Sequence, residues 1–245
     1  MIDYEGDGFR QHYRALVYYA SYLKTICHNF FHGNFVIPQW DFAIAEGNDI
    51  IQTFHYYCLG DVFTVFSVLF PLDKMYLFYD FATFCRMYTA GLAFSCLCFY
   101  KQKNDFWAVL TGSLLYCFSE YALAFMSTHV FFISAMVFLP MIILGVEKIL
   151  NDDSPYFFSL AVCLSALSNI YFFYMNVLST AIYVAVRILM MKGEIKEKTS
   201  HFIKIFLYSL LGLLMSFAIT LPMLWIILSG SRLQSPIISS TFYSI

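Results

Sequence analysis

The stretch VFFISAMVFLPMIILGVEKIL (130–150) decides the fold, because it is predominantly apolar and carries no charge before Glu147 and Lys148 near its end. A helix needs about 20 consecutive apolar residues to cross a lipid bilayer, and this stretch reaches that length. Similar runs recur along the chain, whose 245 residues are 60% hydrophobic and only 12% charged. Soluble domains have about a quarter of their residues charged. The sequence therefore predicts an all-α polytopic membrane protein.

Apolar runs predict about six transmembrane helices. The run 156–191 is too long for one span, because about 20 residues suffice. The lysines of 101–103 and 192–198 join Lys148 on one side of the membrane only if this run crosses twice, turning near SNIYFFYM (168–175). The positive-inside rule assigns that side to the cytoplasm. The expected transmembrane domain, 75–230, has helices at 75–100, 106–126, 130–150, 156–172, 174–191 and 202–230.

Residues 1–74 are expected to form an extracytoplasmic first loop. FRQHYRALVYYASYLKTICHNFF (9–31) repeats apolar residues at helical spacing, which predicts an amphipathic helix. GNDIIQTFHYYCLGDVFTVFSVLFP (47–71) is apolar but interrupted, which predicts short interfacial or re-entrant helices. Residues 231–245 are expected to begin another outer segment. No signal peptide precedes the loop, so we expect a fragment that lacks a first helix and a C-terminal region.

The net charge and the cysteines indicate whether nucleic-acid binding or disulfides are to be expected. The formal net charge is -2 and no basic stripe is present, so we expect no nucleic-acid partner. The seven cysteines are odd in number and contain no CxxC motif, which favours small buried apolar side chains. Cys27 and Cys58 are the pair that could form a disulfide if both face an oxidising compartment.

Acidic side chains gather in the first loop of a chain that is almost uncharged afterwards. Asp7 can act as a general base toward a hydroxyl, or it caps the helix that begins near Phe9. Arg10 and Arg14 follow three and seven residues later and share a helical face. They either grip a phosphate or anchor the helix among lipid headgroups. The acids of this loop are Asp3, Glu5, Asp7, Asp41, Glu46 and Asp49.

An ordered series of short segments resembles the YfhO family of bacterial membrane proteins along nearly the whole chain. No single segment is decisive, but their order is specific. The segments are GDGFRQHY (6–13), IPQWDFAIAEGND (37–49), YYCLGDVFTVFSVLFP (56–71), AGLAFSCLCFY (90–100), LLYCFSEY (114–121), FLPMIILGVEKIL (138–150), SNIYFFYM (168–175) and LPMLWIILSGSR (221–232).

The resemblance implies a GT-C type glycosyltransferase fold in the bacterial cell membrane, with its site facing outside. It implies a polyprenyl-phosphate-linked sugar as donor and a cell-envelope polymer, such as teichoic acid, as acceptor. Family members have one helix before the GD motif and continue past the LP…SR segment, and neither part is present in this sequence. The resemblance therefore implies an enzyme of which this fragment alone can be inactive.

The resemblance places the acidic residue of the first outer loop at Asp7, which becomes the expected catalytic base. Asp7 and Asp49 are also the candidates for binding a divalent cation, Mg²⁺ or Mn²⁺, although no ligand spacing here is diagnostic. The residues expected to bind the donor phosphate or sugar are Arg10, Arg14, Trp40, Asp49, Tyr57, His129, Asn169 and Arg232.

Several of these residues have simpler interpretations. Trp40 and Tyr57 suit an aromatic belt at the membrane interface. His129 is an isolated loop histidine, and Asn169 satisfies a broken helix backbone. Arg86, inside a span, is expected to pair with Glu120. The whole chain is alternatively a lipid or solute transporter, because such proteins also carry broken helices and buried acids, or a non-catalytic membrane scaffold.

Overall fold

The structure is a computed structural model that describes residues 6–44, 47–101 and 105–229. Residues 6–74 are here called the cap, and their described part contains one 18-residue helix, several short helices and an antiparallel pair of two-residue strands. The cap consists of η1 (Gly8–Tyr13), α1 (Arg14–Phe31), β1 (Trp40–Asp41), β2 (Asn48–Asp49), α2 (Ile50–His55), α3 (Val62–Val65), η2 (Phe66–Leu69) and η3 (Leu72–Lys74).

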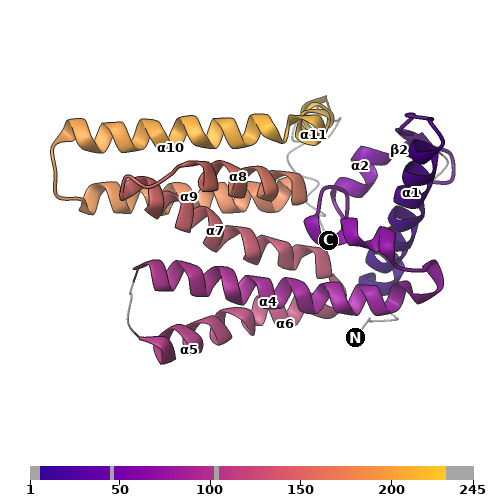
Figure 1. The fold of residues 1–245 in the computed structure, drawn as a ribbon, viewed down its shortest axis with the longest axis horizontal. Coiled ribbons are helices and arrows are strands. Elements are labelled where there is room, and N and C mark those ends of the chain that lie inside the picture. The colour runs from indigo at the N-terminus through magenta and orange to yellow at the C-terminus, as the bar shows by residue number, and fades with distance from the viewer. Residues whose placement is uncertain (1–5, 45–46, 102–104, 230–245) are drawn as a thin grey trace, which may run out of the picture.

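Residues 75–229, here called the bundle, are helical with short connections. Figure 1 shows successive helices running back and forth between two ends, with the cap across one of them. The other end carries Lys101, Lys148 and the connection 191–194, and it is called the lysine end below. The bundle consists of α4 (Met75–Lys101), α5 (Phe106–Cys117), α6 (Glu120–Thr128), η4 (Val130–Ile133), α7 (Ser134–Leu150), α8 (Tyr156–Ser168), α9 (Ile170–Met190), α10 (Ile195–Met215) and α11 (Phe217–Ser229).

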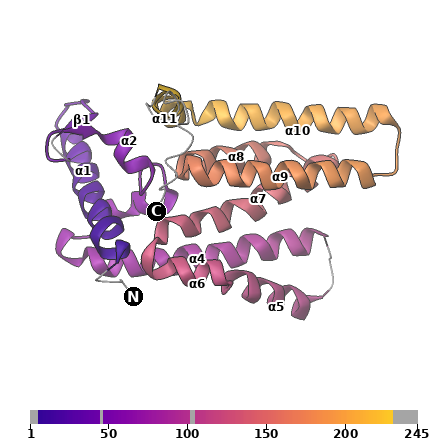
Figure 2. The same ribbon diagram turned by 180° about the vertical axis from the view of Figure 1, so that it is seen from behind.

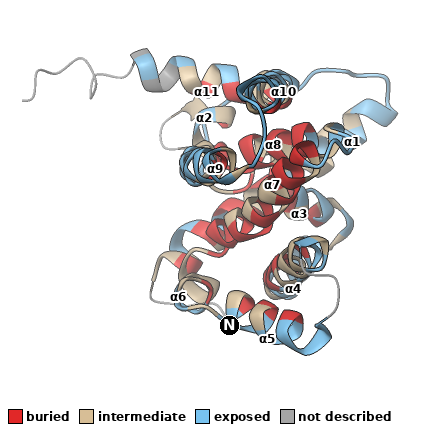
Figure 3. Cartoon of the chain, turned by 90° about the vertical axis from the view of Figure 1, so that its left-hand side faces the viewer, coloured by how far each residue is buried: buried red, intermediate tan, exposed pale blue. Residues whose placement is uncertain are grey.

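The stretch 130–150 forms the centre of the bundle. Its most apolar window is 78% buried, against 17% for α9. Figure 3 shows the buried α7 between α4 on one side and α8 and α9 on the other. A helix that is apolar on all sides is stable when other helices surround it, whereas α9 presents most of its surface to the surroundings.

The prediction of six complete spans was wrong in detail. Among the described residues, three helices are long and apolar enough to cross a membrane, and each of two bent pairs adds one more span if it counts as a single crossing. The predicted helix 106–126 bends by 42° between α5 and α6. The predicted helix 202–230 begins earlier, at Ile195, and bends by 86° after α10. α8 has 13 residues, about 20 Å of helix, which is shorter than the hydrocarbon core.

The predicted turn near SNIYFFYM is confirmed at Asn169, where α8 ends and α9 begins. The amphipathic helix 9–31 is confirmed as well, since α1 buries Leu16, Tyr19 and Ala20. Its second half is more open, and Phe31 is exposed. Figures 1 and 2 show α1 and α11 lying crosswise to the long helices at the cap end.

The predicted grouping of lysines is found at one end of the bundle, which carries Lys101, Lys148 and the connection after α9.

Glu147, with a side chain 1% exposed, joins three helices at the lysine end. It accepts hydrogen bonds from Lys101 Nζ at 2.7 Å and from Arg187 Nε and Nη2 at 2.6 and 3.0 Å. The Tyr183 hydroxyl donates to the same carboxylate. A buried carboxylate is stable only when such partners replace its lost hydration.

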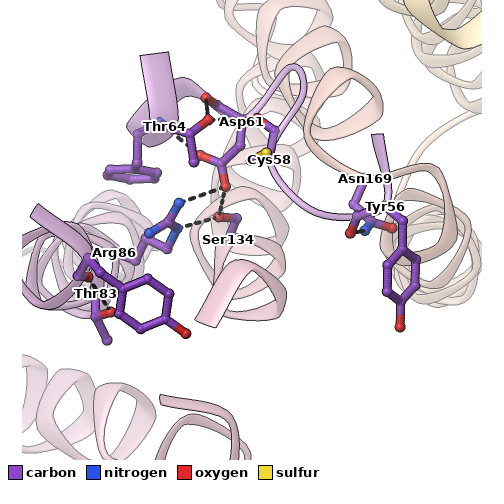
Figure 4. Close-up of polar contacts among 10 residues, drawn as sticks. Tyr56, Cys58, Asp61, Thr64, Thr83, Arg86, Ser134 and Asn169 are labelled. Atoms are coloured by element: carbon purple, nitrogen blue, oxygen red, sulfur yellow. Dashed lines mark hydrogen bonds and ion pairs between the residues drawn. The ribbon is translucent and has the colours of Figure 1, made fainter. Parts of the chain in front are cut away.

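The cap is joined to the bundle through Asp61, which is 1% exposed. Its Oδ2 accepts from Arg86 Nη2 of α4 at 3.0 Å and from Ser134 Oγ of α7 at 2.7 Å. Arg86 Nε also donates to Ser134 Oγ, as Figure 4 shows. The Arg86 guanidinium lies between the rings of Phe63 and Phe131, 5.1 and 5.2 Å from their centroids. The expected pairing of Arg86 with Glu120 was therefore wrong, because Asp61 occupies that role.

Gly60 permits this approach of the cap. Its φ is +83°, a left-handed conformation that favours glycine. A Cβ at this position would lie 2.2 Å from the Leu167 carbonyl oxygen near the end of α8. Any other residue at position 60 would push the cap away from the bundle.

Removing the charge of Arg86 is expected to destabilise the protein. Arg86→Met leaves Asp61 buried without its cation, which costs about 3–5 kcal/mol of unfolding free energy. The double variant Asp61→Asn with Arg86→Met removes both charges and is expected to lose less. Denaturant unfolding in detergent micelles measures both. Equal losses in the two variants would contradict a mutually compensating pair.

Glu147→Gln is expected to lower the unfolding free energy by about 1–3 kcal/mol, because two cations and a hydroxyl lose their common acceptor. Glu120→Gln is the matched control, since Glu120 is exposed on α6 and its replacement should change stability by less than about 0.5 kcal/mol. Thermal unfolding of both variants in the same detergent makes the comparison. Similar melting temperatures would show that Glu147 contributes no more than a surface acid.

Candidate functional site

Asp7 is held by side chains from two parts of the chain. Its Oδ1 accepts a hydrogen bond from Gln11 Nε2 at 2.7 Å, one helical turn later. Its Oδ2 lies 3.4 Å from His129 Nε2, which comes from the connection between α6 and η4. Asp7 precedes η1 but makes no side-chain capping bond, so the helix-capping interpretation was wrong. Its side chain is 48% exposed and can meet a molecule from outside.

Gly8 brings Asp7 to this position. A Cβ on Gly8 would lie 2.3 Å from the Ser127 carbonyl oxygen in the last turn of α6. The backbone of η1 can therefore rest directly on the backbone of α6, and the neighbouring Asp7 and His129 meet. η1 is a short π-helix, a form that is often found at functional sites.

Tyr57 belongs to the same group of residues. Its hydroxyl donates to Gln11 Oε1 at 2.9 Å, so Gln11 links Tyr57 to Asp7. Burial, and also the Asp7 carboxylate, raise the pKa of Tyr57 and of its neighbour Tyr56. Both phenols therefore keep their protons at neutral pH and remain hydrogen-bond donors.

His12 lies behind this group and is fully buried. Its ring centroid is 4.8 Å from that of His129 and 5.2 Å from that of Tyr57. Within the described part of the chain, neither ring nitrogen of His12 has a hydrogen-bond partner. Burial, with His129 and Arg86 nearby, lowers the pKa of His12 to about 3, so its ring is neutral at physiological pH.

Aromatic rings form the wall around the two histidines. Phe132 stacks on His129 at 4.9 Å between centroids and lies 5.5 Å from His12. Phe131 lies 5.2 Å from His12, and Phe125 lies 5.7 Å from His129. Such a wall keeps water from one side of the Asp7–His129 pair and strengthens its electrostatic interactions. Asp7, Gln11, Tyr57, His129 and this wall are called the cap site below.

Arg10 and Arg14 are exposed on the segment that begins at Asp7. The Arg14 guanidinium lies 5.8 Å from the ring centroid of Phe9. In the residues that the structure covers, neither arginine forms an ion pair with an acid. Two such arginines beside a carboxylate leave their donors available to an anion from outside.

Trp40 and Asp49 lie on the β1–β2 ribbon, where they are directly paired. Asp49 Oδ1 accepts from the Gln52 backbone N–H at 2.8 Å and caps α2. Trp40 is 55% exposed. No contact among the described residues joins either of them to Asp7, and no group of three or more histidines, cysteines and acids suited to a metal occurs there. The binding of a divalent cation by Asp7 and Asp49 stays a prediction.

Asn169 has the structural role that its simpler interpretation described. Its Oδ1 accepts from the backbone N–H groups of Tyr171 and Phe172 at 3.0 and 3.3 Å, which caps α9. Its Nδ2 donates to the Tyr56 carbonyl oxygen at 3.0 Å, as Figure 4 shows. It therefore positions the Tyr56–Tyr57 segment against the bundle. Arg232 lies outside the described residues.

Sequence reasoning missed Gln11, His12 and Asp61. The spacing of Asp7 and Gln11 at i and i+4 was the available signal, because such pairs hydrogen-bond on a helix. His12 and His129 are more than a hundred residues apart, and no local pattern relates them. In the sequence, Asp61 is recognisable only as a polar interruption of the apolar segment 47–71. Nothing local there indicates its partner Arg86.

The cap site can accept a proton from a molecule that approaches Asp7. The carboxylate keeps free lone pairs beyond the hydrogen bond that it accepts from Gln11 and its contact with His129. Its exposure admits a ligand, and the buried rings behind it limit access by water. Carboxylates held in this way are suited to general-base chemistry on a hydroxyl.

Comparison with known proteins supplies the family. A family profile described as "Bacterial membrane protein YfhO" matches residues 4–244. A Bacillus subtilis (strain 168) protein described as "Uncharacterized protein YfhO" is 28% identical over 215 residues. That match covers 83% of this chain and 24% of the relative, so the chain spans about a quarter of the relative's length. No solved structure matches. The chain belongs to the YfhO family of bacterial membrane proteins.

Proposed function

We propose that this chain carries the catalytic part of a membrane glycosyltransferase. The enzyme moves a sugar from a polyprenyl-phosphate donor to a hydroxyl of a cell-envelope polymer such as teichoic acid. The observation that carries this proposal is the half-exposed Asp7 carboxylate, held between Gln11 and His129 at the cap end of a helical membrane bundle. Because the chain spans about a quarter of its relative, the activity belongs to the whole protein.

The proposed reaction is a single displacement at C1 of the sugar. The acceptor oxygen forms a bond to C1 as Asp7 takes the hydroxyl proton. The bond from C1 to the phosphate oxygen breaks, and the electron pair leaves with the lipid phosphate. Arg10 and Arg14 are the cations in the cap that can bind this phosphate, since developing negative charge on the leaving group needs such partners.

The orientation of the protein supports an outer site. Lys101, Lys148 and the lysines after α9 lie at the lysine end, opposite the cap. Lysine-rich connections normally remain in the cytoplasm. The cap and its carboxylate then face the compartment in which envelope polymers are built.

The transporter alternative has less support. A transporter of this kind would carry its functional ionisable groups at mid-membrane depth. The buried Arg86 is instead paired with Asp61 and Ser134 and holds the cap in place.

Asp7→Asn is expected to lower the rate constant for sugar transfer by about 10²–10⁴-fold, because the amide cannot accept the proton but keeps the geometry. Transfer of radiolabelled sugar in membranes that contain the full-length protein measures this. Asp41→Asn is the control, since Asp41 bonds to Tyr18 and Ala43 away from Asp7. Unchanged transfer by Asp7→Asn at equal protein level would remove Asp7 as the base.

Substitutions of His129 separate orientation from proton transfer. His129→Gln keeps an N–H group for Asp7 and is expected to reduce kcat by less than about tenfold. His129→Leu removes that group and is expected to reduce kcat further. The same transfer assay gives kcat and KM for both. If Gln and Leu reduce kcat equally, by the amount that Asp7→Asn does, His129 itself is the base.

A further inference from the structure

A groove of about 640 Å³ runs along the bundle between α9 and α10. Both helices pack on α8, and the short segment 191–194 joins them at the lysine end. The groove is lined from Phe173 near the start of α9 to Leu189 near its end, and from Phe202 to Leu213 on α10. It therefore extends from the half of the bundle nearer the lysine end toward the cap end.

The lining of the groove is apolar along its length. Ala181 and Ala185, one turn apart on α9, leave the space that larger side chains would fill. Thr180 contributes a hydroxyl that is buried and, within the described residues, has no hydrogen-bond partner. Ligand sites of roughly 300–1,000 Å³ with apolar walls and few polar groups are typical of small-molecule binding.

The volume is suited to an occupant thinner than a helix. A helix about 10 Å wide and 30 Å long occupies roughly 2,400 Å³, so the groove cannot enclose one, and a helix would only lie over its open side. A single extended hydrocarbon chain is much thinner. A glycerophospholipid brings two such chains, whereas a polyprenyl phosphate brings one.

The cap-end limit of the groove adjoins the cap site. Phe173 follows Phe172, whose ring centroid is 4.7 Å from that of Phe132. Phe132 in turn stacks on His129 at 4.9 Å. A lipid whose chain lies along α9 would thus present its headgroup on the side of the bundle where Asp7 is located.

We propose that this groove binds the isoprenoid chain of the lipid-phosphate donor. The assignment rests on the proposed function, because that function supplies the single-chain lipid phosphate. The groove holds the chain in the membrane and fixes the depth of the phosphate, while the cap residues act on the sugar.

Photolabelling tests this assignment without requiring sugar transfer. The probe is a polyprenyl phosphate that carries a diazirine on its chain and no sugar, added to membranes that contain the full-length protein. Labelled peptides are expected from α9 and α10. Asp7→Asn should label like the wild type, because Asp7 lies outside the groove. Labelling of α9 and α10 without any sugar transfer by the wild-type protein would count against the proposed function and not against the groove.

Filling the groove gives the decisive comparison. Ala181→Phe with Ala185→Phe is expected to reduce labelling about tenfold or more, because the space is occupied. The matched control is Ile182→Phe with Val186→Phe, which adds the same rings on the exposed side of α9 outside the groove. If the double variant does not fold, Ala185→Leu is the milder groove-filling variant, and it should reduce labelling in part.

Three results would overturn the proposal. The first is equal labelling of the groove-filling and control variants. The second is equal labelling, or full competition, by a two-chain phosphatidic acid with the same diazirine. The third is cross-linking of a cysteine at Ala181 to another helix of the full-length protein, which would show that protein fills the groove.

Discussion

The buried contact of Asp61 with Arg86 and Ser134 is the interaction on which the arrangement of this protein depends. It joins three parts of the chain that are far apart in sequence: the cap, α4 and α7. Each charge would be unstable in this environment without the other, so the cap can settle in only one register on the bundle. The same register places η1 against the end of α6 and brings Asp7 to His129.

Helix α7 is held in place at both of its ends. It is the most buried of the long helices and carries a partner for each end of the molecule. Ser134, in its first turn, contacts Asp61, and Glu147, in its last turns, binds Lys101 and Arg187. The central helix is thus fixed at both ends by polar contacts and along its length by apolar packing. α9, which is largely uncovered, is free to form one wall of the groove.

Local patterns predicted much of the fold. The helical spacing of apolar residues predicted α1, and the placement of lysines predicted that 156–191 turns back, which it does at Asn169. The bends were not predictable in this way. Pro222 is the obvious helix breaker near the end of the chain, yet it lies inside α11 and the 86° bend falls at Ser216. That bend lets α11 reach α2 in the cap, a contact between distant segments.

The cap site was predictable only in part. A carboxylate in the first loop pointed to Asp7, and the i, i+4 spacing would have pointed to Gln11. Trp40 and Asp49 looked equally suitable from their residue types, but they form a ribbon and a helix cap. His129 meets Asp7 only because Gly8 lets two backbones touch. Such contacts depend on tertiary packing, which one sequence does not record locally.

We propose that sugar transfer takes place at the cap, on the outer face of the membrane. The most direct measurement uses sealed right-side-out vesicles that contain the full-length protein and are loaded with a radiolabelled polyprenyl-phosphate sugar. Envelope polymer is supplied only outside. We expect labelled polymer in the outer medium, and transfer should stop when an added protease digests the cap. No labelled polymer, or labelling only after the vesicles are opened, would contradict it.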